Sequence, residues 1–103
     1  MDKIRVLRKE PGKPAAWVEI ENELAALQEA VGGYIETVTL FTDLVIICDE
    51  EGKLKGAPYN CEICGIDFVG PVLIAGVKGE EFADLKISAE GMMAVFPEME
   101  VGQ

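Results

Sequence analysis

The chain has 103 residues, half of them apolar, and its 19 acidic and 9 basic side chains give a formal net charge of −10 at pH 7 without a single histidine. This length predicts one domain over residues 1–103, and the apolar share supports a hydrophobic core and argues against disorder. No apolar run approaches the roughly 20 residues of a membrane helix, and the N-terminus lacks a signal peptide's apolar block, so we expect a cytoplasmic protein without a membrane partner.

The charges are unevenly distributed along the chain. Residues 1–13 carry five basic and two acidic side chains, whereas residues 14–52 carry nine acidic side chains and no basic one. We expect no direct binding to nucleic acid, because phosphate affinity depends on cations. The acidic segment could bind a basic partner or mimic nucleic acid, although a charge run is more often a solvated face that keeps a protein soluble. The candidate partner-binding carboxylates are Glu19, Glu21, Glu23, Glu29, Glu36, Asp49, Glu50 and Glu51.

Two alternating segments near the N-terminus predict a β-hairpin. Residues 4–7 and 17–20 each place apolar side chains on one face, and the loop between them contains two prolines and a glycine, which interrupt a hydrogen-bonded ladder. Pairing these strands would place two cations opposite two acids, which favours this register. The residues concerned are Lys3 and Arg5 on the first strand and Glu19 and Glu21 on the second.

Residues 24–35 are the expected organising element of the fold, with a short amphipathic helix, a glycine stop and the start of a strand. Asn22 is the expected N-cap, because its side chain can accept a hydrogen bond from the first helical turn. Gly32 or Gly33 supplies the left-handed cap that residues with a Cβ resist. The stripe expected to face the core consists of Leu24, Leu27 and Val31.

Two strands are predicted after the helix. Residues 34–41 are rich in aromatic and β-branched side chains, and a turn follows at residues 42–43. Residues 44–48 are apolar on both faces, which is typical of a central strand that is covered on each side. A turn at residues 49–53 comes next, after which residues 53–55 could pair back briefly.

The second half of the chain predicts less regular structure. Residues 56–65 are expected to form a loop, and residues 68–75 a late strand that Gly70-Pro71 interrupts. Because proline cannot donate to a ladder, this strand should be bulged there or lie at a sheet edge. Residues 77–84 are expected to form a polar loop.

A short helix or turn is expected near the C-terminus, with Ser88 as its cap and Pro97 as its end. Taken together, the elements predict an α+β fold. It consists of a small, mostly antiparallel β-sheet, one main packed α-helix and a short C-terminal helix or turn.

The three cysteines do not predict a metal or redox site. Their odd number argues against a disulfide framework, and Cys48 lies in an apolar run where a thiol is usually part of the core. Cys61 and Cys64 have the spacing of a metal or redox pair, but a structural zinc site needs four ligands, and a redox pair belongs at a helix N-terminus. Two reduced loop cysteines are the simpler interpretation.

No other pattern predicts catalysis or a cofactor. The missing histidine excludes serine–histidine and cysteine–histidine nucleophile arrangements. The carboxylates of residues 49–51 are consecutive, unlike the spaced ligands of a calcium loop, and no glycine-rich phosphate loop precedes a helix. We therefore expect no metal, no cofactor and no catalytic residue.

Pro58, Tyr59 and Asn60 form the segment best suited to a small ligand. Tyrosine can stack on a planar group, and the asparagine amide both donates and accepts hydrogen bonds. The alternative is that Asn60 satisfies the backbone of its own turn, which is the common role of asparagine in turns. A phosphate-bearing ligand would also need cations. The candidates are Arg5, Arg8, Lys53 and Lys55.

Three motifs together resemble a known family. They are L-x-x-L-Q-x-x-V-G-G-Y-I-E from Leu24, I-C-D-E-E-G-K-L from Ile47, and Pro58-x-Asn60. The family is catalogued as domain of unknown function 3846 and is common in phages and conjugative elements of gut Firmicutes; the similarity covers roughly residues 3–85. Asp49 stands where asparagine is frequent in that family, and Pro71 where threonine is expected. The resemblance implies a mobile-element origin and brings no established activity, catalytic residue or cofactor.

These features predict a non-enzymatic accessory protein of a phage or mobile genetic element. It would bind a host protein through its acidic surface, as an inhibitor of host defence or a nucleic-acid mimic would. The alternative is a small-molecule or nucleotide-signal binding protein, a sponge, with a loop site near Tyr59 and Asn60 that two subunits could share. Homo-oligomerisation is left open. An enzyme ranks last because the sequence contains no recognisable acid–base constellation.

Overall fold

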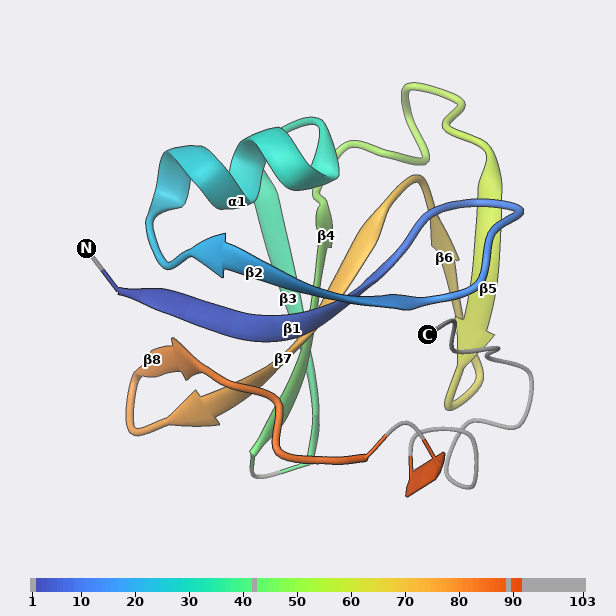
Figure 1. Cartoon of the computed structure of the whole chain (residues 1–103). Helices are drawn as coiled ribbons and strands as arrows, with labels where there is room; N and C mark the ends of the chain where they lie inside the picture. Colours follow the sequence, from blue (N-terminus) through green and yellow to red (C-terminus); the bar gives the residue numbers. More distant parts are fainter. Residues whose placement is uncertain (1, 42, 89, 92–103) are drawn as a thin grey trace.

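The fold is organised around an antiparallel sheet whose central strand comes late in the sequence. The computed structural model of the protein describes residues 2–41, 43–88, 90 and 91. Strand β7 (Val72–Lys78) pairs with β4 (Leu44–Asp49) on one side and with β1 (Lys3–Lys9) on the other. Strands β2 (Ala16–Glu21) and β3 (Ile35–Phe41) complete the order β2-β1-β7-β4-β3, in which every pair is antiparallel (Figure 1).

The N-terminal hairpin is confirmed in its predicted register. Arg5 faces Glu19 across the two strands, and Lys3 faces Glu21. The Arg5 guanidinium also lies 4.0 Å from the centroid of the Trp17 ring, a cation–π contact on the same face of the hairpin.

Both faces of β4 are buried, as its continuous apolar run predicts. Val45 and Ile47 face one side, and Leu44, Ile46 and Cys48 face the other. Helix α1 (Leu24–Val31) covers the first side through Leu27 and Val31. The second side is covered by a separate hairpin, so that the helix and this hairpin lie on opposite sides of the sheet (Figure 1).

That hairpin consists of β5 (Tyr59–Ile63) and β6 (Ile66–Val69), and it corrects the expected loop over residues 56–65. The two residues that connect the strands are Cys64 and Gly65, with φ angles of 51° and 78°. Two successive positive φ values belong to the tight turn that matches the twist of a β-hairpin. The turn was missed because a cysteine stands where asparagine or aspartate usually precedes the glycine.

The prediction of a single interrupted strand over residues 68–75, bulged or at a sheet edge, was also wrong. Gly70, with φ 70°, and Pro71 separate β6 from β7, so the proline lies before the ladder and β7 sits at the centre of the sheet instead of at an edge. The polar loop expected at residues 77–84 is largely strand, because β7 continues to Lys78 and turns back at Gly79 into β8 (Glu81–Ala83). Residues 53–55, by contrast, form a turn instead of a strand.

The two ends of α1 differ in how well they were predicted. Gly32 is the left-handed C-cap, with φ 87° and its N–H donating to the Gln28 carbonyl at 2.8 Å. The N-cap is Glu23 instead of Asn22, whose side chain instead donates to the Phe82 carbonyl at 3.0 Å and ties the helix entry to β8. Leu24 was expected in the core but is 57% exposed, and the buried residues of α1 are Leu27 and Val31.

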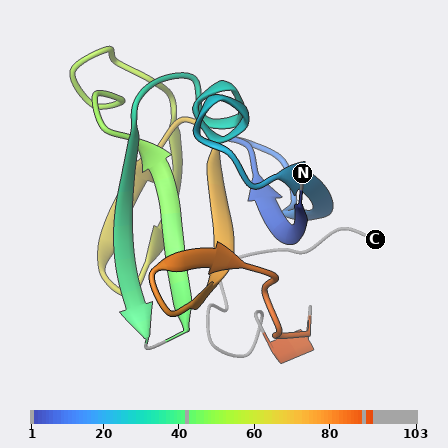
Figure 2. The same ribbon diagram turned by 90° about the vertical axis from the view of Figure 1, so that its left-hand side faces the viewer.

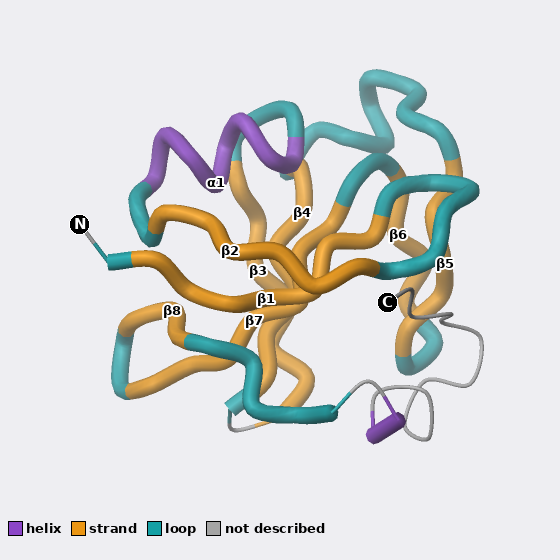
Figure 3. The backbone as a smooth tube through the Cα atoms, viewed as in Figure 1, coloured by secondary structure: helices purple, strands orange, loops and turns teal. Residues whose placement is uncertain are grey.

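The Ser88 hydroxyl accepts a hydrogen bond from the Gly91 N–H at 2.9 Å, which is the geometry expected of a cap. Pro97 and the rest of the expected C-terminal helix, together with Thr42 of the expected turn at residues 42–43, lie outside the described residues. Within them, strands predominate and α1 is the one helix longer than a turn (Figure 3). The protein is therefore largely β, with one packed helix, and no helix in the described part is long and apolar enough to cross a bilayer.

Gly76, in the middle of β7, provides a test of this arrangement. An added Cβ would overlap the Asp84 carbonyl, in a segment that hydrogen-bonds to both the N–H and the carbonyl of Arg5. We predict that Gly76→Ala lowers the free energy of unfolding by about 3 kcal/mol, because neither backbone can move away alone. The control Gly79→Ala meets no atom within 4 Å and should lose roughly 1–2 kcal/mol from its positive φ. If urea denaturation showed the same loss of unfolding free energy for both variants, the close approach of Gly76 to Asp84 would be contradicted.

Candidate functional site

The acidic segment does not gather on one face of the molecule. Glu19 and Glu21 lie on edge strand β2, Glu23 is the N-cap of α1, and Glu29 lies within the helix. The others lie at or near the opposite edge: Glu36 on β3, Asp49 at the end of β4, and Glu50 and Glu51 in the turn that follows. Of the eight candidate carboxylates, Asp49 is the only one with an ion pair inside the described ranges. Asp49 thus has an ion-pair partner within the described residues, which the other seven lack.

Asp49 joins three parts of the chain. Its Oδ1 accepts a hydrogen bond from the Glu51 N–H at 2.9 Å, and its Oδ2 lies 3.0 Å from the Lys55 Nζ. The same Nζ donates to the Gly32 carbonyl at 3.3 Å, at the C-terminal end of α1. The Asp49 side chain is only 7% exposed, so this pair anchors the loop after β4 to the helix end.

This anchor explains the second glycine of the Gly32-Gly33 pair. Gly32 adopts the left-handed cap, whereas a Cβ at Gly33 would lie 2.6 Å from the Asp49 Oδ1 and 2.8 Å from the Lys55 Nζ. The two glycines therefore have different functions, one conformational and one steric. The hydrogen bond from Glu51 and the pairing with Lys55 hold the pKa of Asp49 below its usual value, against the effect of burial.

The four candidate cations are also separated. Arg5 lies over Trp17, while Arg8, three residues further along β1, projects from the opposite face of the strand and pairs with Glu10 at 3.4 Å. Lys55 is held by Asp49, and Lys53 is exposed in the same loop. The structure therefore gives no single cluster of these four cations around Tyr59.

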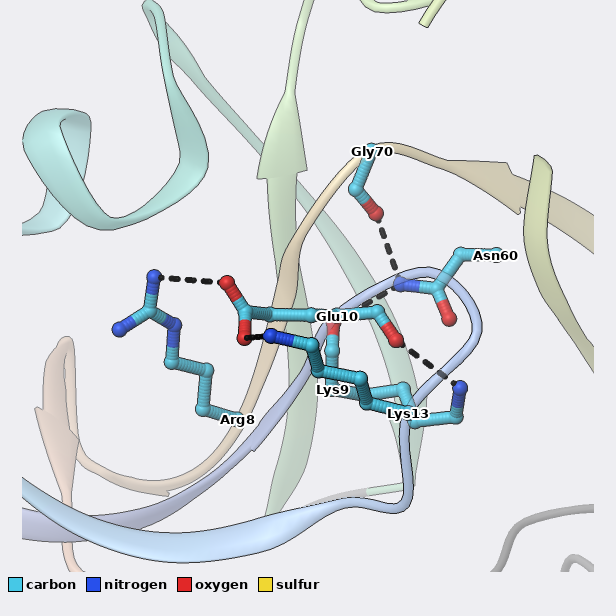
Figure 4. Close-up of polar contacts among 6 residues, drawn as sticks. All are labelled: Arg8, Lys9, Glu10, Lys13, Asn60 and Gly70. Atoms are coloured by element: carbon cyan, nitrogen blue, oxygen red, sulfur yellow. Dashed lines mark hydrogen bonds and ion pairs between the residues drawn. The ribbon is translucent and has the colours of Figure 1, made fainter. Parts of the chain in front are cut away.

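Asn60 occupies a buried joint between three segments (Figure 4). Its Nδ2 donates to the Lys9 carbonyl at 2.8 Å and to the Gly70 carbonyl at 2.7 Å, so both amide hydrogens are used. The side chain is 8% exposed, and its Oδ1 is buried without a hydrogen-bond partner among the described residues. These contacts tie the β5–β6 hairpin to the end of β1 and to the turn before β7.

The neighbours of Asn60 remain accessible. Pro58 and Tyr59 are exposed, and the Tyr59 hydroxyl lies 3.5 Å from the Asp67 Oδ1 on the paired strand. An exposed tyrosine could still stack on a planar ligand. The ligand site near Tyr59 and Asn60 stays a prediction, now with the Asn60 amide engaged by the protein's own backbone.

Two cavities were not anticipated from the sequence. The larger, of about 600 Å³, lies where β4 begins and β7 ends. Its lining includes Phe41, Leu44, Leu85 and Ile87. These residues come from separate segments, so only the folded chain brings them together, and no local pattern could have predicted the cavity.

The second cavity, of about 310 Å³, lies between the β3–β4 pair and β6. Its lining combines acidic side chains, including Glu36 and Asp67, with the apolar Phe68, and it also includes Cys48. Burial and the nearby carboxylates of Glu36 and Asp49 raise the pKa of Cys48 to about 11, so its thiol is protonated at neutral pH and a poor nucleophile. In the described part of the chain, no three cysteine or acidic side chains are arranged to hold a metal ion.

The Asp49 anchor predicts a pH-dependent contribution to stability. Since the folded pKa lies below the unfolded one, the charged form stabilises the fold above the usual aspartate pKa, and this stabilisation is lost as the pH falls through the lowered value. Asp49→Asn should therefore lower the free energy of unfolding by about 1–2 kcal/mol at neutral pH. The difference from wild type should shrink on acidification. The adjacent, exposed Glu50→Gln serves as the control and should change little at any pH, and a pH-independent Asp49→Asn effect would contradict the anchor.

The joint at Asn60 predicts a loss of stability when its amide is removed. Asn60→Ala leaves two carbonyls without their donor and should lower the free energy of unfolding by about 2–4 kcal/mol, measured by urea denaturation. Glu62→Gln, an exposed change on the same strand, should stay within roughly 0.5 kcal/mol of wild type. If Asn60→Ala left stability intact, the amide would not have the structural role inferred from its contacts.

Comparison with known proteins identifies the family without adding an activity. No curated protein and no solved structure matches the chain significantly. The family described as "Domain of unknown function (DUF3846)" matches residues 4–95, which includes the helix and the described strands except for Lys3, the first residue of β1. The chain therefore belongs to the DUF3846 family.

Proposed function

We propose that the protein is a non-enzymatic accessory protein of a phage or mobile genetic element that binds the basic surface of a host protein. In this role it would act as an inhibitor of host defence or as a mimic of nucleic acid. The resemblance to a mobile-element family supports the choice of a host partner. The charge distribution supports the choice of a basic surface.

The observation that carries this proposal is the run of carboxylates without counter-charges in residues 14–52. Glu19 and Glu21 face Arg5 and Lys3 across the hairpin, and Asp49 is committed to Lys55. The remaining exposed acids have no ion pair within the described ranges. They are Glu29, Glu36, Asp43, Glu50 and Glu51.

Four of these acids lie near one another along the chain's contacts: Glu36 on edge strand β3, Glu50 and Glu51 in the turn after β4, and Glu29 in the last turn of α1, whose C-terminal end is bonded to Lys55 of the same loop. Asp43 lies apart from them, between the end of β3 and the start of β4. Exposed charge of one sign accelerates the encounter with an oppositely charged partner and makes the association weaken as salt rises. The proposal therefore concerns this region instead of the whole acidic segment.

Two triple variants of equal net charge test the proposal. Glu29→Gln/Glu50→Gln/Glu51→Gln removes acids from the proposed surface, and Glu62→Gln/Glu80→Gln/Glu90→Gln removes the same number of exposed acids elsewhere. Wild type and both variants are immobilised and exposed to a host lysate, and retained proteins are identified and then titrated in purified form. We expect a basic partner whose affinity falls by about tenfold or more with the first variant and by much less with the second.

The salt dependence gives a second readout. Binding of the partner to wild type should weaken as salt rises, with a shallower dependence for the first variant than for the control variant. Equal effects of the two variants would show that only net charge matters, and the specific surface would then be wrong.

A further inference from the structure

The two edges of the main sheet are protected to different degrees. An edge strand presents unpaired N–H and carbonyl groups, and proteins usually shield such an edge with charged side chains, proline, bulges or a covering segment. Edge strand β2 carries Glu19 and Glu21 and follows Pro14. Edge strand β3 has the sequence IETVTLF, with Glu36 as its one charged residue and no proline.

The hydrogen-bond pattern shows which backbone groups of β3 face outward. The Glu50 N–H donates to the Tyr34 carbonyl at 2.8 Å, and the register places Ile35 opposite Asp49 and Glu36 opposite Cys48. Continued by one residue, the same register places Tyr34 opposite Glu50. In an antiparallel ladder, the backbone N–H and carbonyl groups of alternate residues point toward the neighbouring strand. Those of Tyr34, Glu36 and Val38 therefore point toward β4. The N–H and carbonyl groups that point away from β4 belong to Ile35, Thr37 and Thr39.

Nothing in the described part of the chain pairs with this outer side of β3. The sheet order ends at β3, and its only ladder is with β4. Figure 2 shows β3 as the teal-green strand outside the lighter green β4. Thr37 and Thr39 are exposed, and the bulge toward β4 begins only after Thr39. Residues 35–39 therefore form a regular, uncovered strand segment.

We propose that β3 is a pairing edge for a second copy of this chain, joining two sheets into one continuous antiparallel sheet. A two-fold axis through Thr37 would place Thr37 opposite its own copy and Ile35 opposite Thr39, using the outward N–H and carbonyl groups of all three residues.

Side-chain chemistry selects this register over its neighbour. With the axis at Thr37, each Glu36 faces Val38 of the other copy. A shift of the axis to Glu36 would place two carboxylates directly opposite each other, which is destabilising. Threonine pairs and β-branched pairs across strands are favourable, and they supply the remaining contacts of the centred register.

The charge of the molecule gives this pairing a distinctive salt dependence. Each copy carries a net charge of −10, so two copies repel over long range, while the paired segment itself opposes no like charges. Added salt screens the repulsion and leaves the backbone hydrogen bonds in place. Dimerisation should therefore strengthen with salt, whereas binding of a basic partner to the acidic surface should weaken. The two proposals can fail independently.

The test uses the purified full chain in analytical ultracentrifugation, from about 1 µM to about 1 mM protein. We expect a monomer–dimer equilibrium that shifts toward dimer between about 0.05 and about 0.5 M NaCl. A wild-type chain that stays monomeric over the whole range would overturn the proposal. So would a dimer that weakens with salt.

Thr37→Pro is the decisive variant. It removes an N–H that points away from β4, and proline is tolerated on the solvent side of an edge strand, so the fold should survive while the dimer is lost. The matched control is Glu19→Pro on β2, whose N–H also points outward because the adjacent pair, Val18 and Val6, is directed inward. The control should dimerise like wild type.

A second variant and a direct readout keep the test independent of folding defects in the proline variant. Thr37→Lys retains the backbone groups but opposes two ammonium groups at the axis, so it should weaken the dimer at least about tenfold although it lowers the overall repulsion. In amide hydrogen exchange, Ile35, Thr37 and Thr39 should be protected at high protein concentration and exchange fast at low concentration. If Thr37→Pro and Thr37→Lys both dimerised as strongly as wild type, the interface would lie elsewhere. The same conclusion would follow if the exchange of these three amides did not depend on protein concentration.

Discussion

The pairing of β4 with β7 is the constraint on which the rest of the structure depends. Both strands are apolar on both faces, with Ile46, Ile47, Leu73 and Ile74 fully buried, so neither side of the sheet centre can be left in contact with water. A helix of only eight residues covers one side, and a two-stranded hairpin covers the other. Neither cover is stable alone, since a helix this short and an isolated hairpin are both marginal in water. Their stability comes from the sheet that they bury.

Each cover is also held by polar contacts. The Asp49–Lys55 pair bonds to the end of α1, and the Asn60 amide bonds the hairpin to β1 and to the turn before β7. The Asn60 amide is buried, where a polar group must be paired to avoid a large desolvation penalty, whereas in the other anchor the Asp49 side chain is covered and Lys55 is half-exposed. Two residues that looked suited to recognition, Asp49 and Asn60, are thus engaged in holding the fold.

The two proposed interactions depend on different forces in the same region of the molecule. The acidic surface offers long-range attraction that any basic partner would feel, whereas the outer side of β3 offers short-range backbone hydrogen bonds that require an extended strand. Glu36 belongs to both regions, so a dimer would change how that carboxylate is presented. Pairing of two copies would also bring two acidic surfaces into one assembly, which would raise the apparent affinity for a partner with two basic sites through multivalency.

The sequence by itself determined the features that depend on near neighbours in the chain. The alternation of residues 4–7 and 17–20 and the apolar run of β4 follow from local periodicity, and both were predicted correctly. A glycine cap was predicted at Gly32 or Gly33, and the structure has it at Gly32. Tertiary structure decided the features in which distant segments compete for the same group. Asn22 bonds to Phe82 instead of capping its helix, Asn60 bonds to Lys9 and Gly70 instead of its own turn, and β7 reaches the sheet centre because β1 and β4 both pair with it. A local pattern cannot reveal such a partner, because the partner's position is fixed only when the whole sheet has formed.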